Sequence, residues 1–286
     1  MIAAGTSLAS AAPNTPPASF VAVDSITAVF SHTADADLRH GNGEVGVQRY
    51  ELEAGGRTTS SSGANWTHSL GFARTELEAP VAALLPEYLQ ELALKLGWQF
   101  QSGPRWRFMA TVRPGFYGDG SSIQTDTFNA PVLALASYAS SRDLVWSFGV
   151  VANAFSDNPV LPVAGVRWQF APEWIFNVGL PRTGVEWTIS QDITLTAGAT
   201  VQGGAYKTTR APRGASGVAA ARLTDTEFDY REVRVGLGAE FKVTEALRLN
   251  LDAGVSVDQR FEYHEAGVEQ RGDSALFIAV AVTGRF

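Results

Sequence analysis

The chain has 286 residues, of which 45% are hydrophobic and 18% charged, and its formal net charge is −7 at pH 7. It contains no cysteine, which excludes a disulfide-stapled secreted scaffold and a cysteine-ligated metal site. The acidic balance argues against nucleic acid as a partner, because a phosphate backbone requires a basic surface.

No segment approaches the roughly 18 consecutive apolar residues that a transmembrane helix requires. The chain is therefore either soluble, or it crosses a membrane with strands that carry apolar residues at every second position. These two classes remain to be separated by the length of the strands.

The N-terminal segment 1–19 has the composition of a signal-peptide remnant or of a disordered Ala/Pro/Ser/Thr tail. Ala9-Ser10-Ala11 gives a small-residue cleavage pattern, but the first basic residue is Arg39, whereas a signal peptide opens with positive charge. We expect the encoded start to lie inside a longer signal sequence, and residues 20–286 to form one domain.

Period-two alternation dominates the remainder and is clearest toward the C-terminus. Leu247, Leu249 and Leu251 alternate with Arg248, Asn250 and Asp252, for example, which predicts one apolar and one polar face. The predicted strands are 21–30, 44–54, 64–72, 88–102, 105–115, 127–139, 143–155, 162–170, 174–180, 184–190, 193–205, 228–242, 246–258 and 273–286. They number fourteen; twelve is the alternative, because 21–30 and the short pair around Pro181 have the weakest patterns.

Strand length favours a membrane barrel over a soluble β-sandwich, which is the alternative architecture. Soluble strands usually have about 5 or 6 residues, whereas a tilted transmembrane strand needs about 9 to 11. The connections also alternate between tight turns, such as Gly103-Pro104, and long polar loops, such as 206–227. We therefore predict an all-β, antiparallel up-and-down transmembrane barrel with turns on the periplasmic side and loops outside.

The last strand ends in an aromatic residue, Phe286, preceded at alternate positions by Ile278, Val280 and Val282. This pattern resembles the C-terminal signal of outer-membrane β-barrel proteins, and the whole chain resembles an uncharacterised outer-membrane barrel family. The resemblance implies the outer membrane of a Gram-negative-type bacterium as the location. It also implies two partners, the membrane lipids and the barrel-assembly machinery that reads the signal.

The polar face of the predicted strands carries the candidate functional residues. We expect these side chains to line the lumen: Arg105, Arg107, Arg113, Arg234, Glu240, Arg248, Asp252 and Asp258. One interpretation is a lumen packed with cross-strand ion pairs that stabilise a narrow barrel. The other is a pore lining whose opposed charges select solutes.

No enzymatic role, metal site or cofactor is expected. His68 and Ser69 are adjacent, but neighbouring strand residues point to opposite faces and cannot easily act together. The polar groups His32/Asp35/Asp37/His40 and Asp225/Glu227/Asp229 are interpreted as solvated segments, with a divalent-ion site as the alternative. Nucleotide-binding and hydrolase motifs are missing from the sequence.

Three functions follow from this pattern. The first is a narrow, porin-like channel for small polar solutes, and the second is a structural or surface-binding barrel whose loops contact a partner. A lipid-modifying barrel enzyme is the third; it would need a Ser–His or Asp–His pair on one outward rim, and the sequence pattern offers none.

Overall fold

The computed structural model describes residues 23–39, 43–60, 63–120, 124–179 and 181–286. The expected signal-peptide remnant at 1–19 and His40 lie outside these described residues. The strands are β1 (Ser25–Asp37), β2 (Glu44–Thr59), β3 (Asn65–Glu78), β4 (Tyr88–Ser102), β5 (Trp106–Val112), β6 (Gly115–Gly118), β7 (Phe128–Asn129), β8 (Val132–Ala139), β9 (Leu144–Ala152), β10 (Val160–Ala171), β11 (Trp174–Val178), β12 (Arg182–Thr188), β13 (Ile193–Thr208), β14 (Thr226–Lys242), β15 (Leu247–Tyr263), β16 (Val268–Gly272) and β17 (Ala275–Arg285). The helices are η1 (Val81–Ala83), η2 (Thr125–Thr127) and α1 (Gly217–Arg222).

The strands form one closed antiparallel barrel, because β1 pairs with β2 on one side and with β17 on the other. Three strands of the wall are interrupted, so that β5 continues into β6, β7 into β8, and β16 into β17. Counted in this way the wall has fourteen strands. The predicted all-β barrel of about 14 strands is confirmed. The strand count excludes the twelve-strand alternative, and closure excludes the sandwich.

The outer face of the barrel is apolar, as the alternation predicts. Leu237 is 69% exposed and Leu276 is 68% exposed, and other large apolar side chains, including Leu52, Leu70 and Phe148, also project outward. An exterior of this kind cannot face water at low cost, whereas hydrocarbon accepts it. None of the helices in the described part of the chain has the length and hydropathy of a membrane-spanning helix.

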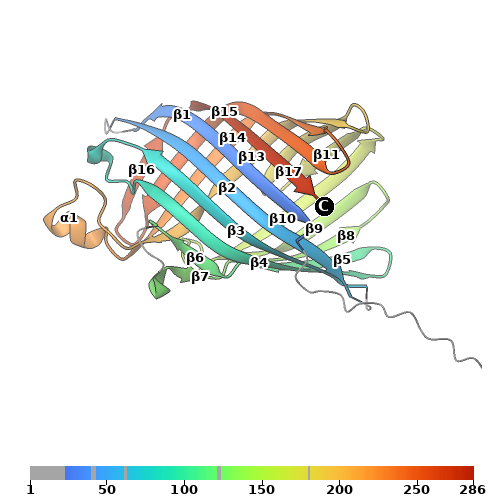
Figure 1. Ribbon diagram of the computed structural model, residues 1–286, viewed down its shortest axis with the longest axis horizontal. Helices are drawn as coiled ribbons and strands as arrows, with labels where there is room; N and C mark the ends of the chain where they lie inside the picture. Colours follow the sequence, from blue (N-terminus) through green and yellow to red (C-terminus); the bar gives the residue numbers. More distant parts are fainter. Residues whose placement is uncertain (1–22, 40–42, 61–62, 121–123, 180) are drawn as a thin grey trace, which may run out of the picture.

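The barrel has two different ends, and its wall has two different heights. Tight turns join the strands at the end where the C-terminus lies, which we call the turn end; the long connections and α1 lie at the opposite, loop end (Figure 1). The strands from β8 to β12 have 5 to 12 residues each and form the short wall. Strands β2–β4 and β13–β15 have 14 to 17 residues and form the tall wall, which runs farther toward the loop end.

Beyond the loop-end edge of the short wall, the two sides of the tall wall come together and pair with each other. Gly118 of β6 pairs in parallel with Lys207 of β13, although five wall strands separate these two strands lower in the barrel. The carboxylate of Asp119 then accepts hydrogen bonds from the backbone N–H groups of Thr209 and Arg210 and from the Thr209 hydroxyl, at 2.9–3.0 Å. The barrel is therefore narrower at its loop end than at its turn end.

The narrow end is filled with apolar and aromatic side chains, which we call the upper core. It consists of Ala36, Leu38, Val45, Val47, Leu77, Ala83, Leu85, Leu89, Ala93, Tyr117, Phe155, Ala205, Tyr206, Leu223, Phe228, Tyr230, Phe261, Tyr263, Ala266 and Ala275. Phe155 alone among these comes from the short-wall side, from the connection between β9 and β10. Burial of each large side chain contributes about 1.5–3 kcal/mol, so the upper core is a stable plug.

The upper core corrects the expectation of a polar interior along the whole barrel. On β14 the inward side chains near the loop end are Phe228 and Tyr230, while the outward ones are Asp229 and Arg231. Below Arg231 the outward side chains become apolar, beginning with Val233 and Val235. The strands are longer than the membrane belt, and beyond it the barrel is packed like a water-soluble one, with polar residues outside.

Candidate functional site

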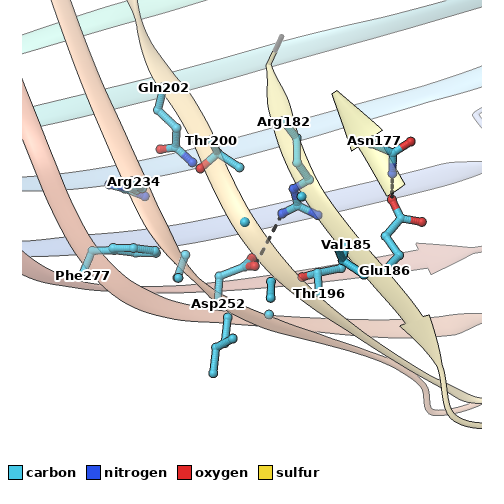
Figure 2. A pocket seen from close by; sticks show the side chains of 17 residues that line it. Asn177, Arg182, Val185, Glu186, Thr196, Thr200, Gln202, Arg234, Asp252 and Phe277 are labelled. Atoms are coloured by element: carbon cyan, nitrogen blue, oxygen red, sulfur yellow. Dashed lines mark hydrogen bonds and ion pairs between the residues drawn. The ribbon is translucent and has the colours of Figure 1, made fainter. Parts of the chain in front are cut away.

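A cavity of about 70 Å³ lies inside the barrel against β11–β15 and β17 (Figure 2). Its polar lining consists of Asn177, Arg182, Glu186, Thr196, Thr200, Gln202, Arg234 and Asp252, and the Phe277 ring lies at one side. A second cavity of about 540 Å³ lies nearer the turn end and is lined by Thr188, Thr194, Glu240 and Asn250. The lower lumen is thus polar, as the sequence predicts for the inward face.

The two cavities meet at an ion pair between Arg182 of β12 and Asp252 of β15, since both residues line both cavities. The Arg182 Nη2 and the Asp252 Oδ1 are 3.5 Å apart, and the two strands are not neighbours in the wall. Both side chains are partly exposed, so this pair contributes little to stability. It places one charge of each sign at the point where the two cavities meet.

Four glycines shape the wall behind the cavity. Gly184, Gly198, Gly236 and Gly254 are directly opposite one another across β12, β13, β14 and β15. A Cβ at Gly198 would collide with the carbonyl oxygen of Thr183 and lie 2.7 Å from the Cα of Gly184. The row therefore lets the sheet bend tightly, which brings Arg182 toward Asp252.

We expect Gly198→Ala to lower the free energy of unfolding by about 1–3 kcal/mol, because the new methyl group has no room between the strands. Gly284→Ala is the matched control, since nothing lies within 4 Å of a Cβ at that position of β17. Urea titration of the protein in lipid vesicles, followed by tryptophan fluorescence, measures both. Equal stability of the two variants would contradict the proposed constraint.

The structure places several of the sequence-predicted lumen residues on the inward face. Arg113 pairs with Glu91, and Arg248 Nη1 lies 2.7 Å from Glu240 Oε1. Asp252 pairs with Arg182, as described above, and Arg107 follows the same inward alternation near the turn end. The sequence did not single out Arg182, because its strand is short and its pattern is weak.

Arg234 is inward but buried, with 2% of its surface exposed, and it forms a pair with the fully buried Glu232 at 3.0 Å. Its Nη2 also donates to Thr33 Oγ1 at 3.0 Å, and its guanidinium lies over the Phe277 ring. This group ties β14 to β1 and β17 directly beneath the upper core. These contacts of Arg234 link strands on different sides of the lumen and stabilise the barrel.

Two predicted lumen residues lie elsewhere. Val233 pairs with Asp258 but Arg234 pairs with Ser256, so a bulge at Val257 turns Asp258 to the outer face, near Arg231. Arg105 lies in the turn before β5 and donates to the Tyr138 hydroxyl, whose ring packs on outward-facing Trp106. A bulge and a turn both break the strict alternation from which these two positions were inferred.

His68 and His264 lie apart from the two cavities of the lower lumen. His68 projects to the same outer face as Trp66 and Leu70, whereas the hydroxyl of Ser69 points inward and donates to Glu53 at 2.7 Å. His264 lies near the loop end, 2.7 Å from Glu227 and 3.6 Å from Asp229. The sequence grouped the two carboxylates but missed His264, which the register of the β14–β15 hairpin places beside them.

Across the described ranges of the chain there is no cluster of three or more side chains with the geometry of a metal site. At the C-terminus, Ile278, Val280 and Val282 project outward from β17, and 83% of Phe286 is exposed. The Phe286 N–H donates to the carbonyl of Asp24 at 3.0 Å, next to the seam between β1 and β17. Recognition of this strand by an assembly machinery stays a prediction.

Solved structures that are similar to this chain include those of a channel, a transporter and a porin. The COG4313 outer membrane channel from Pseudomonas putida F1 has 12% identity and a TM-score of 0.49 over 96% of this chain and 100% of that chain. The Pseudomonas putida toluene transporter TodX has 12% identity and a TM-score of 0.46 over 92% and 90%. The NanC porin has 9% identity and a TM-score of 0.42 over 91% and 100%.

No curated protein sequence matches this chain. One family model does, and it is described as a domain of unknown function, DUF6268. The match covers residues 57–274, from the turn-end part of β2 to the connection before β17, which is more than two thirds of the 286 residues. The chain therefore belongs to the DUF6268 family.

Proposed function

We propose that this protein is an outer-membrane channel for small polar solutes. The observation that carries the proposal is the pair of polar cavities, joined at Arg182 and Asp252, inside a barrel with an apolar exterior. A closed barrel satisfies every backbone group of a membrane-spanning sheet, which supports placement in an outer membrane. The turn end faces the periplasm in this arrangement, and the loop end faces outward.

The upper core fills the barrel at its loop end, so a solute cannot leave along the barrel axis. The solute route passes over the short wall instead. The β11–β12 hairpin covers β13 only up to Thr200, and beyond it a cavity of about 350 Å³ lies beside Val201, Gln202 and Gly203. Gln202 also lines the first cavity, so this residue borders both spaces. The route thus runs from the turn end past Arg182 and Asp252 to an outlet beside the β9–β10 connection.

The β9–β10 connection, residues 153–159, covers this outlet. Its Phe155 side chain is inserted in the upper core, with 8% of its surface exposed. The N–H of Asp157 donates to the carboxylate of Asp229 on β14 at 3.0 Å. These two attachments hold the connection across the gap between β10 and β13, and their release opens the channel.

Planar-bilayer recording of the refolded protein tests the channel. We expect small currents in the wild type and a changed cation-to-anion preference in Arg182→Gln, because this change leaves the Asp252 charge unopposed between the two cavities. Arg213→Gln is the matched control; it removes the same charge from an exposed ion pair in the β13–β14 connection. Absence of current at every voltage, in wild type and variants alike, would favour a structural barrel.

A further inference from the structure

Charged side chains inside the lower lumen are sorted by height around the row of four glycines. Arg182 and Arg234 lie on the level next to this row toward the loop end, joined across the wall through Thr200. Glu186 and Asp252 lie on the level next to it toward the turn end. All four charged residues line the same cavity, so its cations and its carboxylates are separated by a strip of wall without side chains.

Arg182 and Asp252 are the two charged groups that a solute can reach there. Their side chains are 46% and 35% exposed, and the only contact between them, drawn as a dashed line in Figure 2, is 3.5 Å long. This is longer than the about 2.7–3.2 Å of an ordinary N–H···O hydrogen bond. Neither side chain has a further hydrogen bond or ion pair to any residue that the structure describes. Both therefore keep hydrogen-bonding capacity for a ligand.

The other two charges of the cavity are engaged within the protein. Glu186 accepts a hydrogen bond from Asn177 at 2.7 Å and lies 3.8 Å from Arg167. Arg234 is 2% exposed and pairs with Glu232 at 3.0 Å. The accessible site therefore consists of one guanidinium group and one carboxylate, with no net charge.

A site of this kind selects a solute that itself carries both charges. An anion bound to Arg182 is repelled by Asp252, and a cation bound to Asp252 is repelled by Arg182, because each charge stands 3.5 Å from the other. A zwitterion avoids both repulsions. Its carboxylate accepts hydrogen bonds from the guanidinium group while its ammonium group donates to the carboxylate of the protein.

We propose that Arg182 and Asp252 bind small zwitterionic solutes of the amino-acid type, and that these are the solutes of the channel; the second clause rests on the proposed function. The two levels orient such a solute with its carboxylate toward the loop end. The cavity of about 70 Å³ has about twice the roughly 30 Å³ share of a liquid water molecule, which limits the solute to a small one. The neighbouring cavity of about 540 Å³ gives access from the turn end.

The test measures binding to the detergent-solubilised protein by saturation-transfer NMR, with four probes of matched size. Free glycine is the zwitterion, glycolate the anion, glycinamide the cation and glycolamide the neutral probe. We expect the wild type to bind glycine about tenfold or more tightly than each of the other three, because each lacks at least one charged hydrogen-bonding partner. Equal binding of the four probes, or a preference for glycolamide, overturns the proposal.

Charge variants of the site should change the preferred probe in opposite directions. Asp252→Asn leaves Arg182 unopposed and should shift the preference from glycine to glycolate, whereas Arg182→Gln should shift it to glycinamide. Glu87→Gln and Arg213→Gln each break an exposed ion pair outside the lower lumen and serve as controls that keep the preference for glycine. An unchanged preference for glycine in both lumen variants would contradict the assignment.

Planar-bilayer recording of the same preparations separates this site from the proposed channel. Glycine-selective binding by a protein that carries no current supports the site and contradicts the channel. Current through a wild type that binds all four probes equally supports the channel and contradicts the site.

Discussion

Arg234→Met is expected to lower the free energy of unfolding by about 3–5 kcal/mol, because it leaves the buried Glu232 carboxylate without its cation. Thr33 and Tyr230 still donate hydrogen bonds to Glu232, at 2.8 and 2.6 Å, but neither supplies a positive charge. Urea-induced unfolding in lipid vesicles measures the loss, and the heat-modifiability of the folded band on a gel gives an independent readout.

Two further variants define the cause of that loss. Arg234→Met/Glu232→Leu removes both charges and is expected to recover most of the stability, since a buried ion pair gains little over apolar contacts. Arg248→Met breaks the pair with Glu240, in which both side chains are more than a third exposed, and is expected to cost less than about 1 kcal/mol. If all three variants are equally stable, the contacts of Arg234 across the lumen do not stabilise the barrel.

Phe155→Ala is expected to raise the open probability of the proposed channel strongly. Loss of a buried phenylalanine costs about 3–5 kcal/mol, and about 1.4 kcal/mol changes an equilibrium tenfold. If that cost falls on the attachment of the β9–β10 connection, the ratio of detached to attached connections rises by roughly two to three and a half orders of magnitude. Single-channel recording in planar bilayers measures the open fraction directly.

Leu223→Ala is the control for a weakened upper core, because Leu223 is also buried, with 2% of its surface exposed, but enters from the β13–β14 connection at the end of α1. It should lower stability without opening the channel. In this cysteine-free chain, Asp157→Cys/Asp229→Cys can be joined by a short reducible bis-thiol reagent. The cross-link should abolish current and reduction should restore it; current that persists through the cross-link would refute the proposed outlet.

The sequence predicts the barrel well because the period of two follows directly from a sheet with lipid on one side. Leu247 to Val257 alternate without exception, and the structure places this face outward. The same rule gives no information on which inward residues meet across the lumen. The contact between Arg182 and Asp252 depends on the bend at the glycine row, which no local pattern reveals.

The parts that sequence reasoning missed are those where the assumption of a single membrane environment fails. Near the loop end the outward face of β14 carries Asp229 and Arg231, so the same alternation continues with the two faces exchanged. The predicted strand 64–72 is therefore shorter than β3, which continues to Glu78. Its outward residues beyond position 72 are charged, and a charged segment looks like a loop in the sequence. A single extra residue at Val257 then moves Asp258 to the other side of the sheet.

The seam between β1 and β17 has a consequence for biogenesis. It joins residues such as Ser25 and Arg285, which lie at opposite ends of the polypeptide, so the ring cannot be completed until the last strand has been synthesised. Every earlier intermediate carries two unsatisfied sheet edges, which readily add strands from other chains. A truncated product lacking 275–285 would leave one edge of β1 and one edge of β15 unpaired, and aggregation before insertion is its expected fate.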